Sequence, residues 1–343
     1  MSMTNWVIPE HSRSQVKQAG ELIGGGVVFG VPYREARAKI ANFRSAHGYP
    51  LLSVYMHVRN KANRLSAEAV VARRLKRLPT ILDKLDRYPT MNVARMQDLG
   101  GCRVILGQVA EVYELVGALY DSKSRSRIVR EKDYIAEPQT TGYRGVHLVY
   151  EYGASKVQYL GLKIEVQVRT ALQHAWATSV ETMDLFSGSR LKYDDGDPRM
   201  KRYFAVVASL MADHEGTAPV PGAEESADDL RRELLALEAE LSVTGLLSGY
   251  ASIVDQLPSS DRRSTMLLTL WRDTRQLGIS VFETQAEAED HLGTIEALDD
   301  ENIDAVLVSV NKVEQIQSAY PNYFANTSTF LGFVDHQLDR AAT

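Results

Sequence analysis

The sequence predicts an α/β (α+β) protein in which helices flank a mixed sheet. Residues 163–169 alternate strictly between two kinds of side chain, which is the periodicity of a strand with one buried face. The apolar set is Ile164, Val166 and Val168, and the polar set is Glu165, Gln167 and Arg169. Amphipathic helices are predicted at 109–120 and 171–184. Helices therefore lie between and after strands, as in a sheet covered on at least one face.

The remaining elements of the first unit follow from the same periodicities. Further strands are predicted at 101–106, 127–129 and 146–152. Helices are predicted at 15–23, 33–46 and 197–211, together with a long basic helical region at 65–88 that Pro79 interrupts. Thr141 and Gly142 indicate a turn before the strand at 146–152.

The chain is predicted to contain a second, smaller α/β unit after a linker. Residues 216–229 are small, acidic and contain proline, which is typical of a linker. Strands near 266–273, 279–284 and 303–310 then alternate with helices at 286–298 and from Lys312. We therefore expect a first domain at 1–215, a linker with connecting helices at 216–258, and a C-terminal domain at 259–343.

Composition excludes several classes of protein. With 44% hydrophobic residues the chain can bury a core, yet no apolar run approaches the roughly 20 residues of a membrane helix. The first residues also lack a signal-peptide pattern, so we expect a cytoplasmic protein without membrane contact. Cys102 is the single cysteine, which excludes an internal disulfide and multi-cysteine zinc sites, and its apolar neighbours predict a buried strand residue.

Charge is distributed unevenly along the chain. Residues 59–87 contain nine Lys or Arg against three acids, and residues 123–132 contain five against one. Residues 283–304 contain nine acids and no Lys or Arg. The first half therefore favours polyanionic partners, whereas the acidic run would mimic or repel one. Each run alone is equally consistent with a solvated face.

Four motifs occur in order along about 110 residues, and together they resemble one family. The first runs from Arg74 to Lys84 (RLKRLPTILDK), and the second is MQDLGGCRVIL around Asp98. DYI followed by GYRGVH, and then EVQVRT followed by LQHAWA, complete the set. This order resembles the RelA/SpoT synthetase domain, which implies a nucleotidyltransferase-like synthetase fold and an ATP pyrophosphokinase activity.

Pyrophosphate transfer requires cations on phosphates, a metal held by one or two carboxylates, and an acceptor hydroxyl aimed in line. The carboxylates that we assign to Mg²⁺ and to catalysis are Asp98 and Glu165, and Glu165 is also the candidate for taking the acceptor proton. A lone Asp before a strand is more often a cap or turn residue, so the assignment of Asp98 depends on its motif.

The resemblance also implies two substrate subsites. ATP would contact Arg74, Lys76, Arg77, Thr80 and Lys84, with Arg74 stacked on the adenine. The acceptor would contact Tyr143, His147, Gln167 and Arg169, with the Tyr143 ring stacked on a base. Without the motifs, a basic helix face is more often solvated surface, and Tyr143 is equally consistent with a core tyrosine. His174 is as readily explained by core packing.

Departures from the family pattern narrow the expected activity. Thr80 stands where serine is usual, and YRGVH resembles the small and toxic members of the family. The sequence lacks the His-Asp pair of the family's hydrolase domain, so hydrolysis of alarmone is not expected. The C-terminal β-α-β pattern followed by Tyr320 and Tyr323 resembles the fused toxin–antitoxin members called CapRel, whose C-terminal domain is a pseudo-zinc-finger.

That resemblance implies a specific function with its own partners. The first domain would pyrophosphorylate the 3′ CCA end of tRNA and so stop translation in anti-phage defence. Tyr320 and Tyr323 would be autoinhibitory, and a phage major capsid protein would release the block. Alternatives are a small alarmone synthetase that uses GTP or GDP as acceptor, and a non-enzymatic binding protein. The YPNYF stretch is also consistent with an aromatic cluster that ends a helix.

Overall fold

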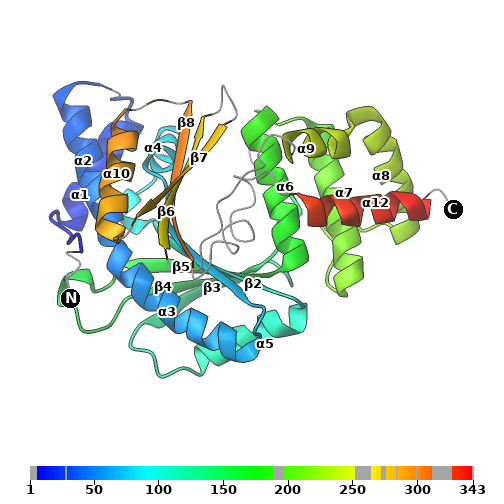
Figure 1. Ribbon diagram of the computed structural model, residues 1–343, viewed down its shortest axis with the longest axis horizontal. Coiled ribbons are helices and arrows are strands. Elements are labelled where there is room, and N and C mark those ends of the chain that lie inside the picture. Colours follow the sequence, from blue (N-terminus) through cyan, green and yellow to red (C-terminus); the bar gives the residue numbers. More distant parts are fainter. Residues whose placement is uncertain are drawn as a thin grey trace.

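The structure, a computed structural model, describes residues 6–27, 29–187, 196–251, 264–271, 276–282, 284–298, 300, 302–310 and 327–341. Its centre is a mixed sheet flanked by helices (Figure 1), which confirms the predicted fold class. Tyr320 and Tyr323 lie outside the described residues, as does the helix predicted from Lys312. None of the described helices is long and apolar enough to span a bilayer.

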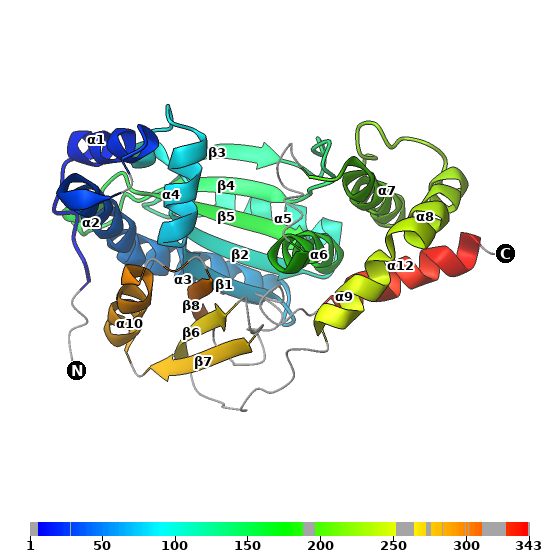
Figure 2. The same cartoon turned by 90° about the horizontal axis from the view of Figure 1, so that it is seen from above.

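The sheet has eight strands in the order β3-β4-β5-β2-β1-β8-β6-β7. Their bounds are β1 Val70–Leu75, β2 Gly100–Leu106, β3 Arg127–Asp133, β4 Val146–Glu151, β5 Lys163–Thr170, β6 Ser264–Trp271, β7 Gln276–Phe282 and β8 Ile303–Val310. The β2–β5 pair is parallel and the other pairs are antiparallel. Figure 2 shows the strands side by side in this order.

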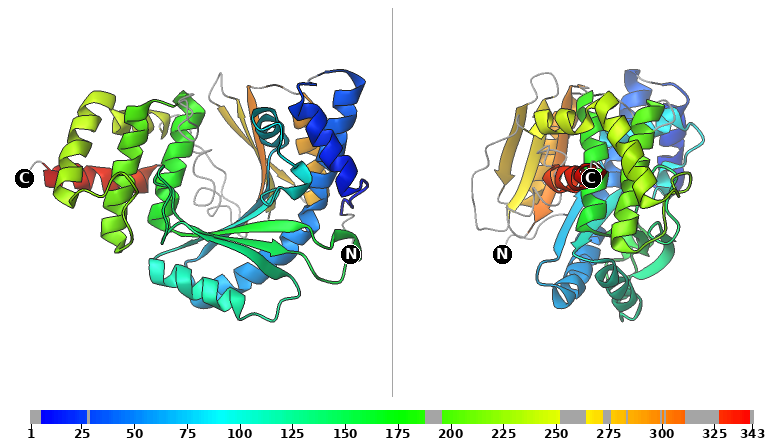
Figure 3. Two further views of the ribbon diagram at one scale, coloured as in Figure 1. Left: turned by 180° about the vertical axis from the view of Figure 1, so that it is seen from behind. Right: turned by 90° about the vertical axis from the view of Figure 1, so that its right-hand side faces the viewer.

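The helices form three groups around the sheet. In chain order they are α1 Arg13–Gly24, α2 Gly30–Ala46, α3 Gly48–Leu65, α4 Leu78–Arg87, α5 Val109–Tyr120, α6 Ala171–Ser187, α7 Pro198–Glu215, α8 Ala227–Leu241, α9 Val243–Ala251, α10 Gln285–Ala297 and α12 Ser328–Ala341. Helices α3 and α5 cover one face of the sheet. Helices α1, α2, α4 and α10 lie at one side of it, and α6 to α9 with α12 form a bundle at the other (Figures 1 and 3).

The core between the sheet and α3 and α5 explains the predicted strand periodicity. Ile164, Val166 and Val168 are fully buried and pack with Val104 of β2 and Val58 of α3. Cys102, which is 1% exposed, belongs to the same cluster, as the sequence predicts. The opposite face of these strands carries the polar side chains Arg103, Glu165 and Gln167. Helices α4 and α6 lie toward the two ends of that face (Figure 2).

The long basic helical region predicted at 65–88 is wrong in its first half. Residues 70–75 form β1, and only residues 78–87 form a helix, α4. Val70 and Val71 are β-branched, and β1 pairs along its whole length with β2. Sheet pairing with a distant segment therefore overrides the local helical pattern of the Arg and Leu residues.

The C-terminal segment adds its strands to the same sheet. Strand β8 is antiparallel to β1, with Arg73 opposite Ser309, and β6 lies between β8 and β7. Helix α12, by contrast, packs into the bundle, where Phe330 and Val334 are fully buried near Phe204. The division into a first domain, a linker and a C-terminal domain remains a prediction, and this segment contributes to both sides of the molecule.

The turn before β4, which contains Gly142, is held in place by close packing. Gly142 has φ +94°, and a Cβ there would lie 2.7 Å from Ala208 Cβ and 2.9 Å from the Trp176 ring. The next buried residue, Arg144, donates a hydrogen bond to the Ala218 carbonyl at 2.5 Å. The turn is thus attached to α6, to α7 and to the start of the predicted linker.

We predict that Gly142→Ala destabilises the protein by about 2–4 kcal/mol, because it adds left-handed backbone strain to a steric clash. Gly117→Ala is the matched control, since Gly117 is exposed in α5 and a Cβ at that position would have no atom within 4 Å. That control should stabilise the chain by about 0.5–1 kcal/mol. Thermal unfolding of both variants checks the prediction, and a loss of the same size at both positions would contradict it.

Candidate active site

The β2–β5 pairing brings the predicted polar residues together. The parallel register sets Gly101 beside Glu165 and Arg103 beside Gln167. The antiparallel pairing of β1 sets Arg74 on the other side of Gly101. Because Gly101 carries no side chain, the floor between Arg74 and Glu165 stays open, and a Cβ at this position would have no atom closer than 3.9 Å.

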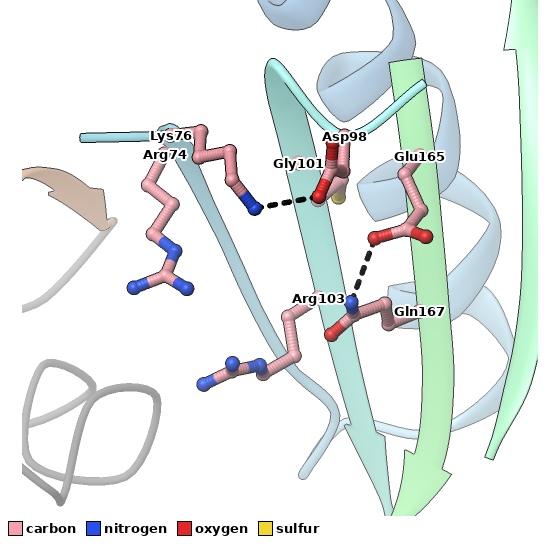
Figure 4. A pocket seen from close by; sticks show the side chains of 8 residues that line it. Arg74, Lys76, Asp98, Gly101, Arg103, Glu165 and Gln167 are labelled. Carbon is pink, nitrogen blue, oxygen red and sulfur yellow. Dashed lines mark hydrogen bonds and ion pairs between the residues drawn. The ribbon is translucent and has the colours of Figure 1, made fainter. Parts of the chain in front are cut away.

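A hollow opens on this face of the sheet (Figure 4). It is lined by Arg74, Lys76, Asp98, Gly101, Cys102, Arg103, Glu165 and Gln167. Asp98 lies in the loop before β2 and Lys76 directly after β1, so two strand ends and one strand face supply the charged groups. The two carboxylates predicted to act together, Asp98 and Glu165, therefore share one hollow.

Two lysines form ion pairs with Asp98. Lys76 Nζ lies 2.6 Å from Asp98 Oδ2, and Lys84 Nζ, from the second turn of α4, lies 3.6 Å from the same atom. Burial alone would raise the pKa of Asp98, but Lys76 and Lys84 hold it below its ordinary value. Burial lowers the pKa of Lys76, and Asp98 opposes that effect. Asp98 is therefore a carboxylate at neutral pH.

Glu165 is held by two neighbours on its own sheet. Its Oε1 lies 3.1 Å from His147 Nδ1, and its Oε2 accepts a hydrogen bond from Gln167 Nε2 at 2.7 Å. Burial would raise the pKa of Glu165, but the hydrogen bond and charge of His147 and the amide of Gln167 keep it below its ordinary value. Glu165 is thus ionised and oriented toward the hollow.

A hydrogen-bonded relay continues from Glu165 to Tyr143. The Tyr143 hydroxyl lies 2.7 Å from His147 Nε2. Because an ionised carboxylate only accepts, His147 Nδ1 donates the hydrogen bond to Glu165, and the Tyr143 hydroxyl makes the next hydrogen bond at Nε2. This chain fixes the orientation of both rings.

The rings of Tyr134, Tyr143 and His147 pack edge-to-face and form an aromatic wall. Tyr134 meets Tyr143 edge-to-face with ring centroids 5.9 Å apart, and it meets His147 in the same way at 5.2 Å. Arg169 is 2% exposed, and burial, reinforced by Arg103, lowers its pKa to about 10. It remains a cation at neutral pH, but it is not among the residues that line the hollow.

The donor set suits Mg²⁺ with a bound polyphosphate. Asp98 and Glu165 supply hard carboxylate oxygens, and Mg²⁺ commonly binds proteins through one or two carboxylates plus substrate phosphates. The described residues contain no cluster of three or more His, Cys, Asp or Glu that would form an all-protein metal site. An ion here would therefore depend on the substrate for its remaining ligands.

Six of the predicted site residues that the structure describes are not among those that line the hollow: Arg77, Thr80, Lys84, Tyr143, His147 and Arg169. Lys84 and His147 nevertheless contact the carboxylates of Asp98 and Glu165. His174, which core packing explains as readily, is buried in α6. Three lining residues, Gly101, Cys102 and Arg103, were given no site role. The signal for Arg103 was a charge on the polar side of GGCRVIL, opposite Cys102 and Val104. Tyr134, within the DYI motif, was likewise given no role.

Comparison with known proteins adds to this geometry. Residues 73–185 match the family described as "Region found in RelA / SpoT proteins". The GTP pyrophosphokinase YjbM of Bacillus subtilis is 29% identical over 171 residues, which is 47% of this chain and 74% of that protein. The GTP pyrophosphokinase YwaC of the same organism is 32% identical over 113 residues, which is 31% of this chain and 52% of YwaC.

Solved structures with similar shape include the small alarmone synthetase 1 of B. subtilis bound to its product pppGpp. It has a TM-score of 0.43 and 21% identity, and the match covers 50% of this chain and 89% of that one. The matched region, 73–185, contains Arg74, Asp98 and Glu165 and all the other residues that line the hollow. Residues 73–185 are therefore similar to the region found in RelA and SpoT proteins, and this similarity supports a pyrophosphotransferase activity.

Proposed function

We propose that the chain transfers pyrophosphate from ATP to a hydroxyl of tRNA, at the 3′ CCA end. The observation that carries the pyrophosphate-transfer step is that Asp98 and Glu165 open onto one hollow together with Arg74 and Lys76. Two ionised carboxylates beside several cations suit a metal-bound polyphosphate.

In the proposed reaction the acceptor oxygen bonds to the β-phosphorus of ATP. The bond from that phosphorus to the oxygen that bridges to the α-phosphate breaks, AMP leaves, and the proton of the acceptor hydroxyl passes to water. Mg²⁺, held by Asp98 and Glu165, would neutralise charge on the phosphates. Lys76 and Lys84 lie where they would hold the donor phosphates, and Arg74 lies on the adjacent strand where it would meet the adenine.

The electrostatics of Glu165 favour one of its two predicted roles. A general base works best with a pKa near the working pH, whereas the pKa of Glu165 is held below that of an ordinary glutamate. Pyrophosphate transfer depends mainly on positioning and charge stabilisation. We therefore assign Glu165 to the metal, and we assign the aromatic wall of Tyr143 with His147 and Gln167 to the acceptor.

Two acceptors are compatible with this wall. The nine cations of residues 59–87 and the five of residues 123–132 support a polyanion larger than a nucleotide, such as tRNA. Two of those five, Arg130 and Lys132, are exposed on β3 directly beside β4, which carries His147. The alternative, synthesis of (p)ppGpp from GTP or GDP, is favoured by the names of the two B. subtilis relatives.

We further propose that the C-terminal segment inhibits the enzyme and that a phage major capsid protein releases it. Support comes from the two anchors of the segment that carries Tyr320 and Tyr323. Before it, β8 pairs with β1, which carries Arg74. After it, α12 packs against α6 and α8 of the bundle. The two tyrosines themselves lie outside the described residues.

We predict that Asp98→Asn and Glu165→Gln each lower the rate of pyrophosphate transfer by about 100-fold or more, because each removes a carboxylate that would hold the metal ion on the phosphates. Release of AMP from ATP, measured with the acceptor present, checks this result. Asp121→Asn, an exposed carboxylate after α5, is the control and should match the wild type. Near-normal rates in both site variants would overturn the assignment.

The acceptor is tested by supplying tRNA or GTP with ATP labelled in its β- or γ-phosphate. We expect label in tRNA, and its loss when the 3′ CCA end is removed, since the proposed acceptor hydroxyl is then absent. The assay uses the full chain with and without the phage capsid protein. Label that appears only in a guanine nucleotide would select the alarmone synthetase alternative.

Autoinhibition is tested in cells by expressing the wild type and Tyr323→Ala. We expect the variant to be more toxic, because the proposed block is removed, and toxicity to disappear when Asp98→Ala is added. Colony counts over a range of inducer concentrations measure the effect. Equal growth of the wild type and the single variant would contradict the inhibitory role of Tyr323.

A further inference from the structure

A buried carboxylate connects the C-terminal segment to the donor side of the hollow. Glu296 belongs to α10, lies within the acidic run of residues 283–304, and is 7% exposed. Its Oε1 accepts a hydrogen bond from the backbone N–H of Leu78 at 3.1 Å, across 218 positions of sequence. The hydrogen bond is therefore a tertiary contact between α10 and the start of α4.

The contact supplies a cap that α4 lacks. The N-cap residue of α4, Arg77, makes no side-chain capping hydrogen bond, and Pro79 has no N–H. The Leu78 N–H would therefore be left without a helical partner at a buried position. A carboxylate at this end of the helix also interacts favourably with the helix dipole. Glu296 thus stabilises the first turn of the helix that carries Lys84.

Arg44 completes the connection from the N-terminal side. Its guanidinium lies 3.4 Å from each oxygen of Glu296, in a pair whose side chains are each 6% exposed. Its Nε donates to the Lys76 carbonyl at 2.6 Å. The Lys76 N–H in turn donates to the Leu99 carbonyl, next to Asp98. The backbone of residues 76–78 is thereby held from three sides.

The backbone held in this way is the one that supports the donor-side cations. The side chain of Lys76 reaches Asp98, and α4 places Lys84 beside the same carboxylate. A shift of the β1–α4 connection would move both lysines relative to Asp98. The backbone of Glu296 is itself fixed, because its carbonyl accepts a hydrogen bond from Arg37 of α2.

We propose that Glu296 is a positioning residue for pyrophosphate transfer, and that through it α10 sets the geometry of the donor-phosphate subsite. This proposal rests on the proposed function, in which Lys76 and Lys84 hold the donor phosphates. It gives the C-terminal segment a contact with the ATP side that is independent of Tyr320 and Tyr323. Displacement of α10 would uncap α4 and leave Arg44 buried without its acid.

Hydrogen–deuterium exchange of the full chain, without nucleotide, tests the positioning role directly. We compare Glu296→Gln and Glu296→Ala with Asp290→Asn, which removes the same charge from an exposed position of the same helix. We expect faster exchange of residues 76–85 in the alanine variant, a smaller effect in the glutamine variant, and none in the control. Unchanged exchange of 76–85 in Glu296→Ala would overturn the proposal.

Kinetics separate positioning from general stability. The measurements use a chain that also carries Tyr323→Ala, so that the proposed block is absent. In this chain Glu296→Gln should raise the KM for ATP about tenfold and change kcat and the acceptor KM by less than about twofold. The reason is that displaced lysines weaken the binding of ATP equally in the ground state and in the transition state. A change of similar size in the KM for ATP, in kcat and in the acceptor KM would show that Glu296 has only a structural role. No transfer by the Tyr323→Ala chain with either acceptor would instead overturn the proposed function, whatever residues 76–85 show.

Discussion

The register between β2 and β5 is the constraint on which the site depends. Side chains alternate along a strand, so a shift of one residue would turn Glu165 into the core and Ile164 toward the hollow. Burial of Ile164, Val166 and Val168 against Val104, α3 and α5 prevents that shift. The hydrophobic core on one face of the sheet thereby determines which polar groups meet on the other face.

The two proposed subsites are connected to different parts of the chain. The proposed donor subsite, with Arg74, Lys76 and Lys84, is bordered by β8 and, through Glu296, by α10. The proposed acceptor subsite, with Tyr143 and His147, begins at a turn packed on α6 and α7. Since α12 joins the same bundle, C-terminal residues contact the structure that supports each subsite. Under the proposed function, a partner that moved the C-terminal segment would act on both subsites.

Local periodicity predicted much of the fold. Helix α5 and the starts of β3, β4 and β5 were placed correctly, because alternation and amphipathicity are read from neighbouring residues. Strand β1 was missed because its identity comes from pairing with β2 and β8, far away in sequence. For the same reason the sequence does not reveal that β8 continues the sheet.

The site was predicted partly from residue chemistry and partly from family resemblance. Motifs placed Arg74, Lys76, Asp98, Glu165 and Gln167 at a common site, and all five line the hollow. Arg103 was missed because a single charge in a buried strand carries little information. Glu296 lay in an acidic run that resembled solvated surface, and only the tertiary contact with Leu78 distinguishes it from its neighbours.

Binding of Mn²⁺ in place of Mg²⁺, followed by electron paramagnetic resonance with a non-hydrolysable ATP analogue, tests whether Asp98 and Glu165 hold one ion jointly with the donor phosphates. We expect nucleotide-dependent binding in a chain that carries Tyr323→Ala, and its loss when either Asp98→Asn or Glu165→Gln is added. Unchanged Mn²⁺ affinity in both of these variants would contradict the account.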